Sequence, residues 1–322
     1  MSDLPPVFIV GAGNMSLAYA KVLSHLGQDF QCLGRGVDSA ARFEAETGIR
    51  PSTGPLADQL EARDLAGAHV IVAVNVPELE SVCSALLKAG AGRILVEKPG
   101  GVDMAALERL GSADSERRLR IAYNRRFLPS VQKAAELIAQ DGGAQVLSFE
   151  FTELSDRIKA ANVHPPEVLA HWYLANSSHV FDLAFHVAGS AGDLSDVTTL
   201  AAAASGTLDW HPAGARFVGC GSFAGAGLFN YSADWQSGGG WGVEVTTSQR
   251  KLTLKPLERL SQQMRNTFDV TPVDIQSEPE GLKPGLLGLV QDFLSFDGAG
   301  CPDIQAHIAR MKTFSAMIKS PV

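Results

Sequence analysis

The first 122 residues alternate between short, continuously apolar runs and longer amphipathic segments. The apolar runs lie at residues 7–10, 30–33, 69–74, 93–96 and 119–122. The segments between them that fit helices are 14–26, 38–47, 78–88 and 104–110, and we expect Asp38 to cap the second of these. Strands that are apolar on both faces are typical of parallel sheets covered by helices on both sides. The pattern therefore predicts an α/β fold built on a doubly wound parallel sheet.

The pattern changes after residue 122, and 322 residues are too many for one comfortable core. A helix is predicted at 131–139, and VLSFEFTE at 146–153 alternates with the period of two that a half-buried strand shows. Further strands at hairpin spacing are predicted at 216–223, 227–235, 242–247 and 251–254, and closing helices at 286–296 and 303–318. We therefore expect a second domain, of α+β type with an antiparallel sheet.

Composition excludes several classes of protein. The net charge of −8 argues against a partner that is a nucleic acid or an anionic membrane. The four cysteines are scattered without a C-x-x-C pair, so neither a disulfide framework nor a zinc ribbon is indicated. The N-terminus does not resemble a signal peptide, and no apolar run approaches the roughly 20 residues of a membrane span. We expect a protein of the reducing cytoplasm.

A glycine pair follows the first predicted strand in VFIVGAGNMS. Gly11 permits a tight turn, Gly13 lets the backbone approach a pyrophosphate, and the following helix offers unpaired N–H groups to the anion. Ser16 stands at the third position, where its small size still permits close packing of helix and strand. In this context the sequence predicts a dinucleotide site; the alternative is an ordinary glycine turn.

The second predicted strand ends in CLGRG, without the acid that usually accepts from the adenosine ribose. Gly34 leaves space there, and Arg35 offers a guanidinium suited to phosphate. We therefore expect NADP as the cofactor, with NAD possible. The alternative is that Arg35 is an ordinary surface residue.

LVEKPGG at residues 95–101 ends an apolar strand on a charged pair that proline then interrupts. Pro99 has no N–H to donate and pushes Lys98 toward an extended conformation. Because ligands bind at the carboxyl ends of strands in such sheets, we expect Lys98 to project into a site.

Residues 177–188 are predicted to form a buried helix in which His179, Asp182 and His186 share one polar stripe. Buried polar groups must find partners or line a cavity. The alternatives are a satisfied internal network or a zinc site, but no further ligand motif accompanies the stripe, so we expect no metal.

These motifs together resemble the Gfo/Idh/MocA family of sugar and polyol dehydrogenases over nearly the whole chain. The resemblance rests on GAG after the first strand, EKP at 97–99, NRRF at 124–127 and H-x-x-D at 179–182, of which EKP is the specific motif. It implies a dinucleotide-binding Rossmann domain at 1–122. It also implies a domain at 123–322 whose open, mainly antiparallel sheet binds substrate and forms a homodimer or homotetramer.

The resemblance also implies roles for individual residues. Lys98 would lie between nicotinamide and substrate, His179 would be the acid/base, and Asp182 would bind substrate hydroxyls. The other candidate substrate contacts are Tyr123, Arg126 and Asn176. The other candidate cofactor contacts are Asn14, Met15, Asn75, Pro77 and Glu97.

One position departs from the family. Many members carry an aspartate four residues before the catalytic histidine, where this chain has Ala175, and this leaves the proton path or the standard substrate in doubt. NSSHVFDLAFH and GLKPGL are similar to a subgroup associated with bacterial surface-sugar biosynthesis, which implies an activated or phosphorylated sugar.

The predicted function is an NAD(P)-dependent enzyme that moves hydride between nicotinamide and a carbinol or keto carbon of a sugar, sugar phosphate or nucleotide sugar. Such a step needs a positioned acid/base, which histidine suits, and a cation that polarises the carbonyl. A non-catalytic regulator that senses dinucleotide or sugar, and a glycosidase that uses NAD, are the alternatives.

Overall fold

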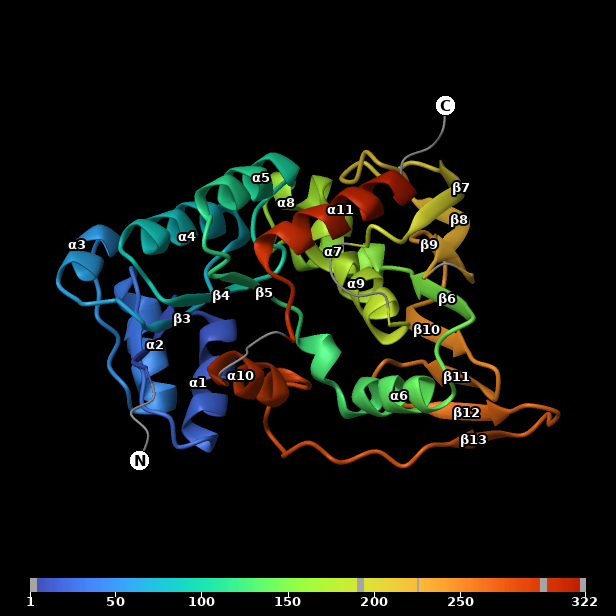
Figure 1. Cartoon of the computed structure of the whole chain (residues 1–322). Coiled ribbons are helices and arrows are strands. Elements are labelled where there is room, and N and C mark those ends of the chain that lie inside the picture. The colour runs from blue at the N-terminus through green and yellow to red at the C-terminus, as the bar shows by residue number, and fades with distance from the viewer. Residues whose placement is uncertain (1–4, 190–193, 225, 296–299, 319–322) are drawn as a thin grey trace. The chain divides into compact units, whose positions relative to one another are not determined.

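The computed structural model describes residues 5–189, 194–224, 226–295 and 300–318, and it contains two compact units (Figure 1). The first unit comprises Met1–Asn124 and Pro279–Ile308. The second comprises Arg125–Glu278 and Ala309–Val322. The first unit is therefore built from two stretches of chain that are far apart in the sequence.

The first unit has a five-stranded parallel sheet in the order β2-β1-β3-β4-β5. The strands are β1 (Val7–Val10), β2 (Gln31–Leu33), β3 (His69–Val72), β4 (Arg93–Glu97) and β5 (Leu119–Ala122). Every residue of β1 and β3 is buried, as the continuously apolar runs require. The strand order reverses between β1 and β3, which is where an open α/β sheet binds its ligand.

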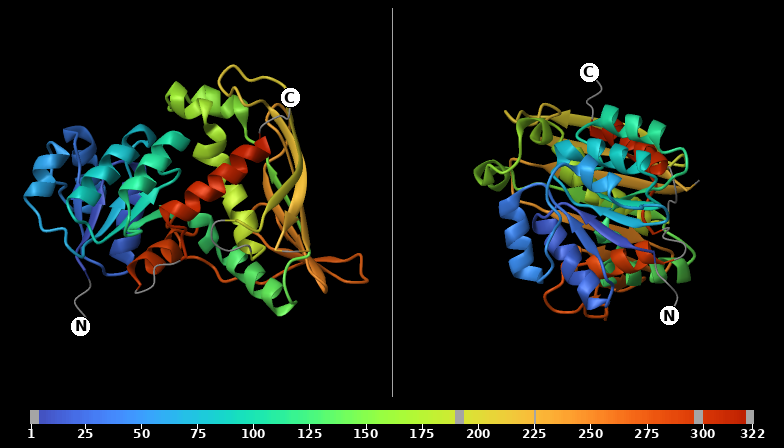
Figure 2. Two further views of the ribbon diagram at one scale, coloured as in Figure 1. Left: turned by 45° about the horizontal axis from the view of Figure 1, so that its top comes forward. Right: turned by 90° about the vertical axis from the view of Figure 1, so that its left-hand side faces the viewer.

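Helices cover both faces of this sheet, with α1, α2 and α10 on one side and α4 and α5 on the other (Figure 1, Figure 2). The helices are α1 (Asn14–His25), α2 (Val37–Thr47), α3 (Leu56–Glu61), α4 (Leu79–Lys88), α5 (Met104–Ala113) and α10 (Leu286–Leu294), with a short 3₁₀ turn at Val76–Glu78. The predicted doubly wound sheet is confirmed. Asp38 does not cap α2 as expected, because the N-cap is Gly36 and Asp38 lies in the first turn.

The second unit has an eight-stranded sheet in the order β13-β12-β11-β10-β6-β9-β8-β7. The strands are β6 (Val146–Phe151), β7 (Thr198–Ser205), β8 (Arg216–Phe223), β9 (Gly227–Asp234), β10 (Trp241–Thr246), β11 (Arg250–Leu254), β12 (Ser261–Met264) and β13 (Val270–Pro272). β6 and β9 pair in parallel and all the other pairs are antiparallel. The expected α+β arrangement with a mainly antiparallel sheet is confirmed.

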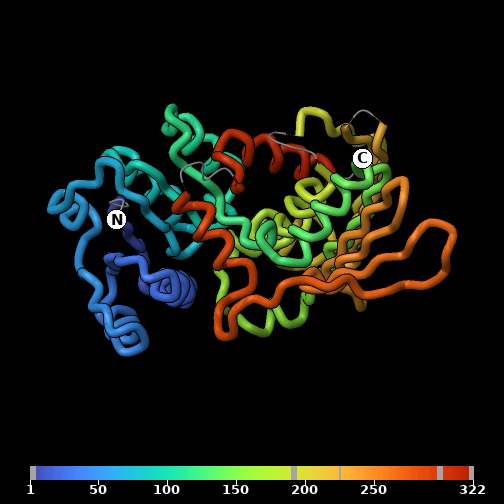
Figure 3. Tube along the Cα trace, turned by 60° about the horizontal axis from the view of Figure 1, so that its bottom comes forward, coloured from blue at the N-terminus to red at the C-terminus, as the bar shows by residue number. Residues whose placement is uncertain are grey.

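Helices pack on one face of this second sheet (Figure 2, Figure 3). They are α6 (Pro129–Gln140), α7 (Ser155–Ala161), α8 (Pro166–Ala170), α9 (Ser178–Val187) and α11 (Ile304–Ile318), which begins in the first unit, while a 3₁₀ turn at Asn124–Phe127 precedes α6. Phe181 and Phe185 of α9 pack on Phe149 of β6, with ring centroids 6.4 and 5.9 Å apart. A π-helical turn, Tyr173–Ser177, leads directly into α9. No helix of the described ranges is long and apolar enough to cross a membrane.

A buried cluster of charges holds α9, α11 and the segment before α6 together. The Asp182 carboxylate accepts from Arg126 Nε and Nη2 at 2.7 and 2.6 Å, and from Arg310 Nε at 3.0 Å. The Asp182 side chain is 1% exposed, and those of Arg126 and Arg310 are 9% and 2% exposed. Burial alone would raise the pKa of Asp182, but the two arginine charges more than offset it and hold the pKa well below its usual range.

Removal of this carboxylate should destabilise the protein strongly. Asp182→Asn leaves two buried guanidinium groups without a counter-charge, a change that costs about 3–5 kcal/mol. Urea unfolding measures the loss, and Asp209→Asn, which breaks the exposed ion pair with Lys159, is the control with little expected effect.

The same cluster predicts how stability depends on pH. A depressed folded-state pKa contributes stability that is fully present above the unfolded value of about 3.9 and is lost as the pH falls below it. Asp182→Asn should lack this part of the acid dependence. Equal losses in the free energy of unfolding for Asp182→Asn and Asp209→Asn would show that the buried cluster stabilises the protein no more than an exposed ion pair does.

Candidate active site

The glycine loop between β1 and α1 is packed tightly at its first glycine and open at its second. Gly11 has a φ of +111°, and a Cβ there would lie 2.4 Å from the carbonyl oxygen of Ala73. A Cβ on Gly13 would meet nothing within 4 Å among the described residues. Ser16 Oγ donates to the same Ala73 oxygen at 3.3 Å, so the serine at the third position supports the packing. The loop therefore offers free space where α1 begins.

The start of α1 favours an anion. Its first turn carries no acidic residue, and in the described part of the chain no side chain caps it. The free N–H groups and the positive end of the helix dipole consequently point toward the open loop. This is the geometry that holds a phosphate at a helix N-terminus.

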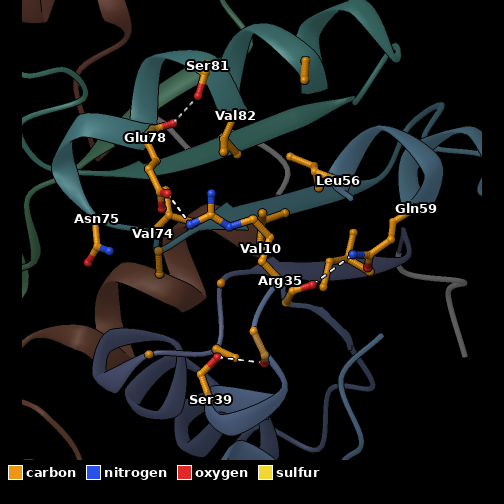
Figure 4. A pocket seen from close by; sticks show the side chains of 18 residues that line it. Val10, Arg35, Ser39, Leu56, Gln59, Val74, Asn75, Glu78, Ser81 and Val82 are labelled. Atoms are coloured by element: carbon orange, nitrogen blue, oxygen red, sulfur yellow. Dashed lines mark hydrogen bonds and ion pairs between the residues drawn. The ribbon is translucent and has the colours of Figure 1, made fainter. Parts of the chain in front are cut away.

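A pocket of ≈ 630 Å³ extends from this loop along the ends of β1, β2 and β3 (Figure 4). It is lined by Val10, Gly11, Ala12, Gly13, Leu33, Gly34, Arg35, Gly36, Ser39, Leu56, Gln59, Ala73, Val74, Asn75, Glu78, Ser81, Val82 and Ala85. Figure 4 shows the guanidinium of Arg35 pointing across the pocket to the carboxylate of Glu78, with which it forms an ion pair. The pocket thus carries a cation beside the end of β2, as the CLGRG sequence predicts.

The polar groups around Arg35 include three that the sequence did not reveal. Gln59 Nε2 donates to the carbonyl oxygen of Gly34 at 2.9 Å, and Ser39 Oγ donates to that of Gly36 at 3.1 Å. Glu78 comes from the turn after β3. None of the three stands in a recognisable motif, so only the folded chain brings them to the pocket.

Of the other predicted cofactor residues, Asn75 lines the pocket, whereas Asn14, Met15 and Pro77 are not among its lining residues. Asn14 Oδ1 accepts from Arg42 Nη2 at 2.7 Å. Pro77 lies in the 3₁₀ turn after β3. Their predicted contacts with the cofactor stay predictions.

Lys98 follows directly on the last residue of β4, and its side chain is partly exposed. The preceding Glu97 accepts a hydrogen bond from the Tyr19 hydroxyl of α1 at 2.7 Å. Burial raises the pKa of Glu97, although this hydrogen bond and the charge of Lys98 oppose the rise. Nε2 of His307 lies 2.9 Å from the carbonyl oxygen of Pro99. Both sides of Lys98 are therefore fixed by contacts within the first unit.

In the second unit, His179 lies in the first turn of α9 and is 7% exposed. Its ring centroid is 6.0 Å from that of Trp241 in β10. Just before α9, Asn176 Nδ2 and Ser177 Oγ donate to the carboxylate of Glu153, the latter at 2.7 Å. Glu153, which is 5% exposed, follows the end of β6. The structure thus places an acid beside the residues that adjoin Ala175.

A second pocket, of ≈ 490 Å³, opens beside this cluster and is largely aromatic and apolar. It is lined by Thr152, Glu153, Leu154, Arg157, Ile158, Ala161, His164, Trp172, Gly239, Gly240 and Trp241. The rings of His164 and Trp172 meet edge to face with centroids 4.9 Å apart. An aromatic wall with one buried carboxylate can pack against the C–H face of a sugar ring and accept from its hydroxyls.

Three other predicted substrate residues, Tyr123, Arg126 and Asp182, are not among the residues that line this second pocket. Asp182 and Arg126 bind each other in the buried cluster described above, and neither lines the pocket. Tyr123 belongs to the first unit, is fully buried and packs beside His307 with ring centroids 5.6 Å apart. Contacts of these three residues with a substrate stay predictions, and the burial of the three side chains does not support such contacts.

His186, the third member of the predicted polar stripe, is half-buried. Burial and the charge of Arg126 lower its pKa to about 4. Within the described ranges, no group of three or more His, Cys, Asp or Glu residues lies close enough to hold a metal ion.

Residues 6–98 match the model of a family described as NADP oxidoreductase, coenzyme F420-dependent. A search of curated proteins gave no significant match.

Three solved structures are similar along nearly their whole length. The UDP-N-acetylglucosamine 3-dehydrogenase GnnA from Acidithiobacillus ferrooxidans has a TM-score of 0.71 at 17% identity, with 98% of this chain and 96% of that chain covered. The dehydrogenase MviM from Clostridium difficile has 0.76 at 15% identity, with 98% and 99% covered. A levoglucosan dehydrogenase in complex with NADH has 0.75 at 15% identity, with 98% and 96% covered.

The matches extend over both units of the chain. The family match covers β1 to β4 with the glycine loop, and the structural matches cover both units. The chain therefore has the fold of the sugar and nucleotide-sugar dehydrogenases, as its resemblance to the Gfo/Idh/MocA family predicts.

Proposed function

We propose that the protein is an NAD(P)-dependent oxidoreductase that transfers hydride between nicotinamide and a carbinol or keto carbon of a sugar. The observation that carries the proposal is the pocket at the glycine loop. The loop is open at Gly13, and the N-terminus of α1 beside it has no side-chain cap. The pocket lies at the strand ends of the same sheet whose strand β4 is followed by Lys98. The NADP oxidoreductase family match over residues 6–98 supports the proposal. The dehydrogenases of the same fold support a sugar or nucleotide sugar as substrate.

Lys98 and His179 are the proposed catalytic residues. A bound oxidised nicotinamide would supply the hydride acceptor for the carbinol carbon, and the protein's own residues would have to remove the hydroxyl proton at the same step. His179 takes that proton as general base, and the Lys98 ammonium stabilises the oxygen as the carbonyl forms. Reduction uses the same groups in reverse.

Many members of the resembled family carry an aspartate at the position of Ala175, and we propose that Glu153 takes the place of that aspartate. The Glu153 carboxylate holds Asn176 and Ser177, which lie three and two residues before His179. A buried carboxylate in this cluster stabilises a positive charge that develops on a nearby imidazole. We assign substrate binding to the pocket formed by Glu153, Trp172 and Trp241, with Asn176 at its side.

NADP is the proposed cofactor, with NAD as the second choice, because Arg35 supplies a guanidinium where an acid would accept from the ribose. Glu78 now holds that guanidinium, so a 2′-phosphate has to compete with the carboxylate for it. Bidentate contact with a phosphate carrying nearly two charges favours the phosphate.

We place the protein in the cytoplasm and propose a homodimer or homotetramer formed through the second sheet. The face of that sheet opposite Phe149 exposes the apolar side chains of Val146, Val218 and Leu228. An exposed apolar patch of this kind marks an interaction surface.

The role of Arg35 can be tested by cofactor binding alone. Arg35→Ala should weaken NADPH binding by about tenfold, the loss of one charge-assisted contact, and leave NADH nearly unchanged. Glu78→Gln should strengthen NADPH binding, because it releases the guanidinium. Calorimetry measures both, with the exposed Arg50→Ala as control. Equal losses for NADPH and NADH in Arg35→Ala would remove Arg35 from the phosphate site.

The catalytic assignment predicts a loss of turnover without a loss of cofactor. His179→Asn should slow oxidation of UDP-N-acetylglucosamine or levoglucosan, whichever the wild type turns over, by about 10²–10⁴-fold. Lys98→Met should also reduce kcat strongly. NADPH affinity should stay within a few-fold in both. Activity that survives in both variants would mean that the chemistry lies elsewhere.

The contribution of Glu153 should appear in the pH dependence. A carboxylate near His179 raises the pKa of the imidazole, so Glu153→Gln should lower that pKa and move the acidic limb of the oxidative kcat profile to lower pH. Glu244→Gln, which breaks an exposed ion pair with Lys251 on a neighbouring strand, is the matched control. An unmoved acidic limb in Glu153→Gln would exclude the proposed role.

A further inference from the structure

The GLKPGL segment at residues 281–286 lies in the part of the chain that belongs to the first unit, and no role has yet been assigned to its lysine. The segment is fixed on both sides of Lys283. Asn124 Nδ2 donates to the carbonyl oxygen of Pro284 at 2.8 Å, and Gly285, with a φ of +72°, starts α10. Leu286 is fully buried. The backbone of Lys283 is therefore held in place while its side chain remains exposed.

The side chain of Lys283 reaches the start of α1, which packs beside α10 (Figure 1). Its Nζ lies 2.8 Å from Sδ of Met15, a residue 268 positions earlier in the chain and the second residue of α1. A thioether is a weak acceptor, and an ammonium group has three protons to donate. The acceptor that the described structure gives Lys283 is thus one that a charged oxygen would readily displace.

A second observation places the same positive charge near the end of β4. Lys283 is one of the charges that oppose the rise in the pKa of Glu97, the residue before Lys98. Glu97 already accepts from Tyr19, so its carboxylate is engaged. Lys283 therefore lies near both Met15 beside the glycine loop and Glu97 at the end of β4, all within the first unit.

An anion at this place would meet three favourable features at once. They are the open space at Gly13, the uncapped start of α1 and the ammonium of Lys283. The helix end supplies only about half a unit charge, whereas a pyrophosphate brings about two, so a full positive charge beside the helix complements it. The guanidinium of Arg35 is engaged elsewhere, because it points across the pocket to Glu78, with which it forms an ion pair (Figure 4).

We propose that Lys283 binds the pyrophosphate of the dinucleotide cofactor, exchanging the Met15 sulfur for a phosphate oxygen. The inference rests on the proposed function and adds a residue that no glycine-loop motif contains. Because NADH and NADPH share the pyrophosphate, Lys283 should affect both equally, whereas Arg35 should affect NADPH alone. Lys283 would thus contribute to the affinity for both cofactors, and Arg35 would determine the preference for NADPH over NADH.

Titration of the full-length protein with NADPH and with NADH, followed by calorimetry, tests the assignment. Lys283→Met keeps the length of the side chain and removes its charge, and it should weaken both cofactors by about tenfold, the loss of one exposed charge-assisted contact. The loss should shrink as salt is raised, because salt screens the wild-type contact. Lys283→Arg should retain most of the affinity. Lys21→Met, an exposed lysine on α1, is the matched control and should change neither.

Several outcomes would overturn the assignment. Unchanged affinity for both cofactors in Lys283→Met, with NADPH weakened in Arg35→Ala, would reject Lys283 and leave the proposed function standing. A loss confined to NADPH would place Lys283 at the 2′-phosphate, and a loss confined to UDP-N-acetylglucosamine would place it at a substrate phosphate; both contradict the pyrophosphate contact. Wild-type protein that binds neither cofactor would instead overturn the proposed function. An unchanged urea midpoint for Lys283→Met confirms that the variant is folded.

Discussion

The close approach of Gly11 to the carbonyl of Ala73 is the constraint on which the candidate cofactor site depends. A side chain at Gly11 would strike the backbone at the end of β3, and the φ of +111° is one that other residues rarely adopt. The turn lets α1 begin directly behind β1 and aims its free N–H groups into the open space beside Gly13. The pocket, the cation at Arg35 and the lysine from the distant GLKPGL segment are all arranged around that one turn.

In the second unit the corresponding constraint is the burial of two titratable side chains, His179 and Asp182, on one helix. Asp182 is neutralised by Arg126 and Arg310, and the phenylalanines on α9 pack on the sheet. This anchoring leaves the N-terminal end of α9, with His179, beside Trp241. Two residues of the same polar stripe therefore have different roles. Asp182 stabilises the fold, and His179 is the proposed general base.

The sequence was sufficient where a local pattern determines the structure. Continuous apolar runs predicted β1 to β5, the glycine pair predicted the turn before α1, and Pro99 marked the end of β4. The sequence was insufficient where distant residues meet. Nothing local shows that Arg310 would neutralise Asp182, that Glu153 would hold Asn176, or that Lys283 would reach Met15. Short elements such as α7, α8 and the π-helical turn also escaped prediction, because tertiary packing and not propensity stabilises them.

The central claim is that hydride passes between a sugar and the nicotinamide, and isotope transfer tests it most directly. The protein would be incubated with oxidised NADP or NAD and sugars deuterated at their carbinol carbons, levoglucosan and UDP-N-acetylglucosamine among them. Mass spectrometry of the reduced cofactor is the measurement. The account predicts that one sugar delivers one deuterium to the nicotinamide of the cofactor. Tight binding of cofactor and sugar without any reduced or labelled cofactor would contradict it, and would identify the protein as a sensor that uses the same fold.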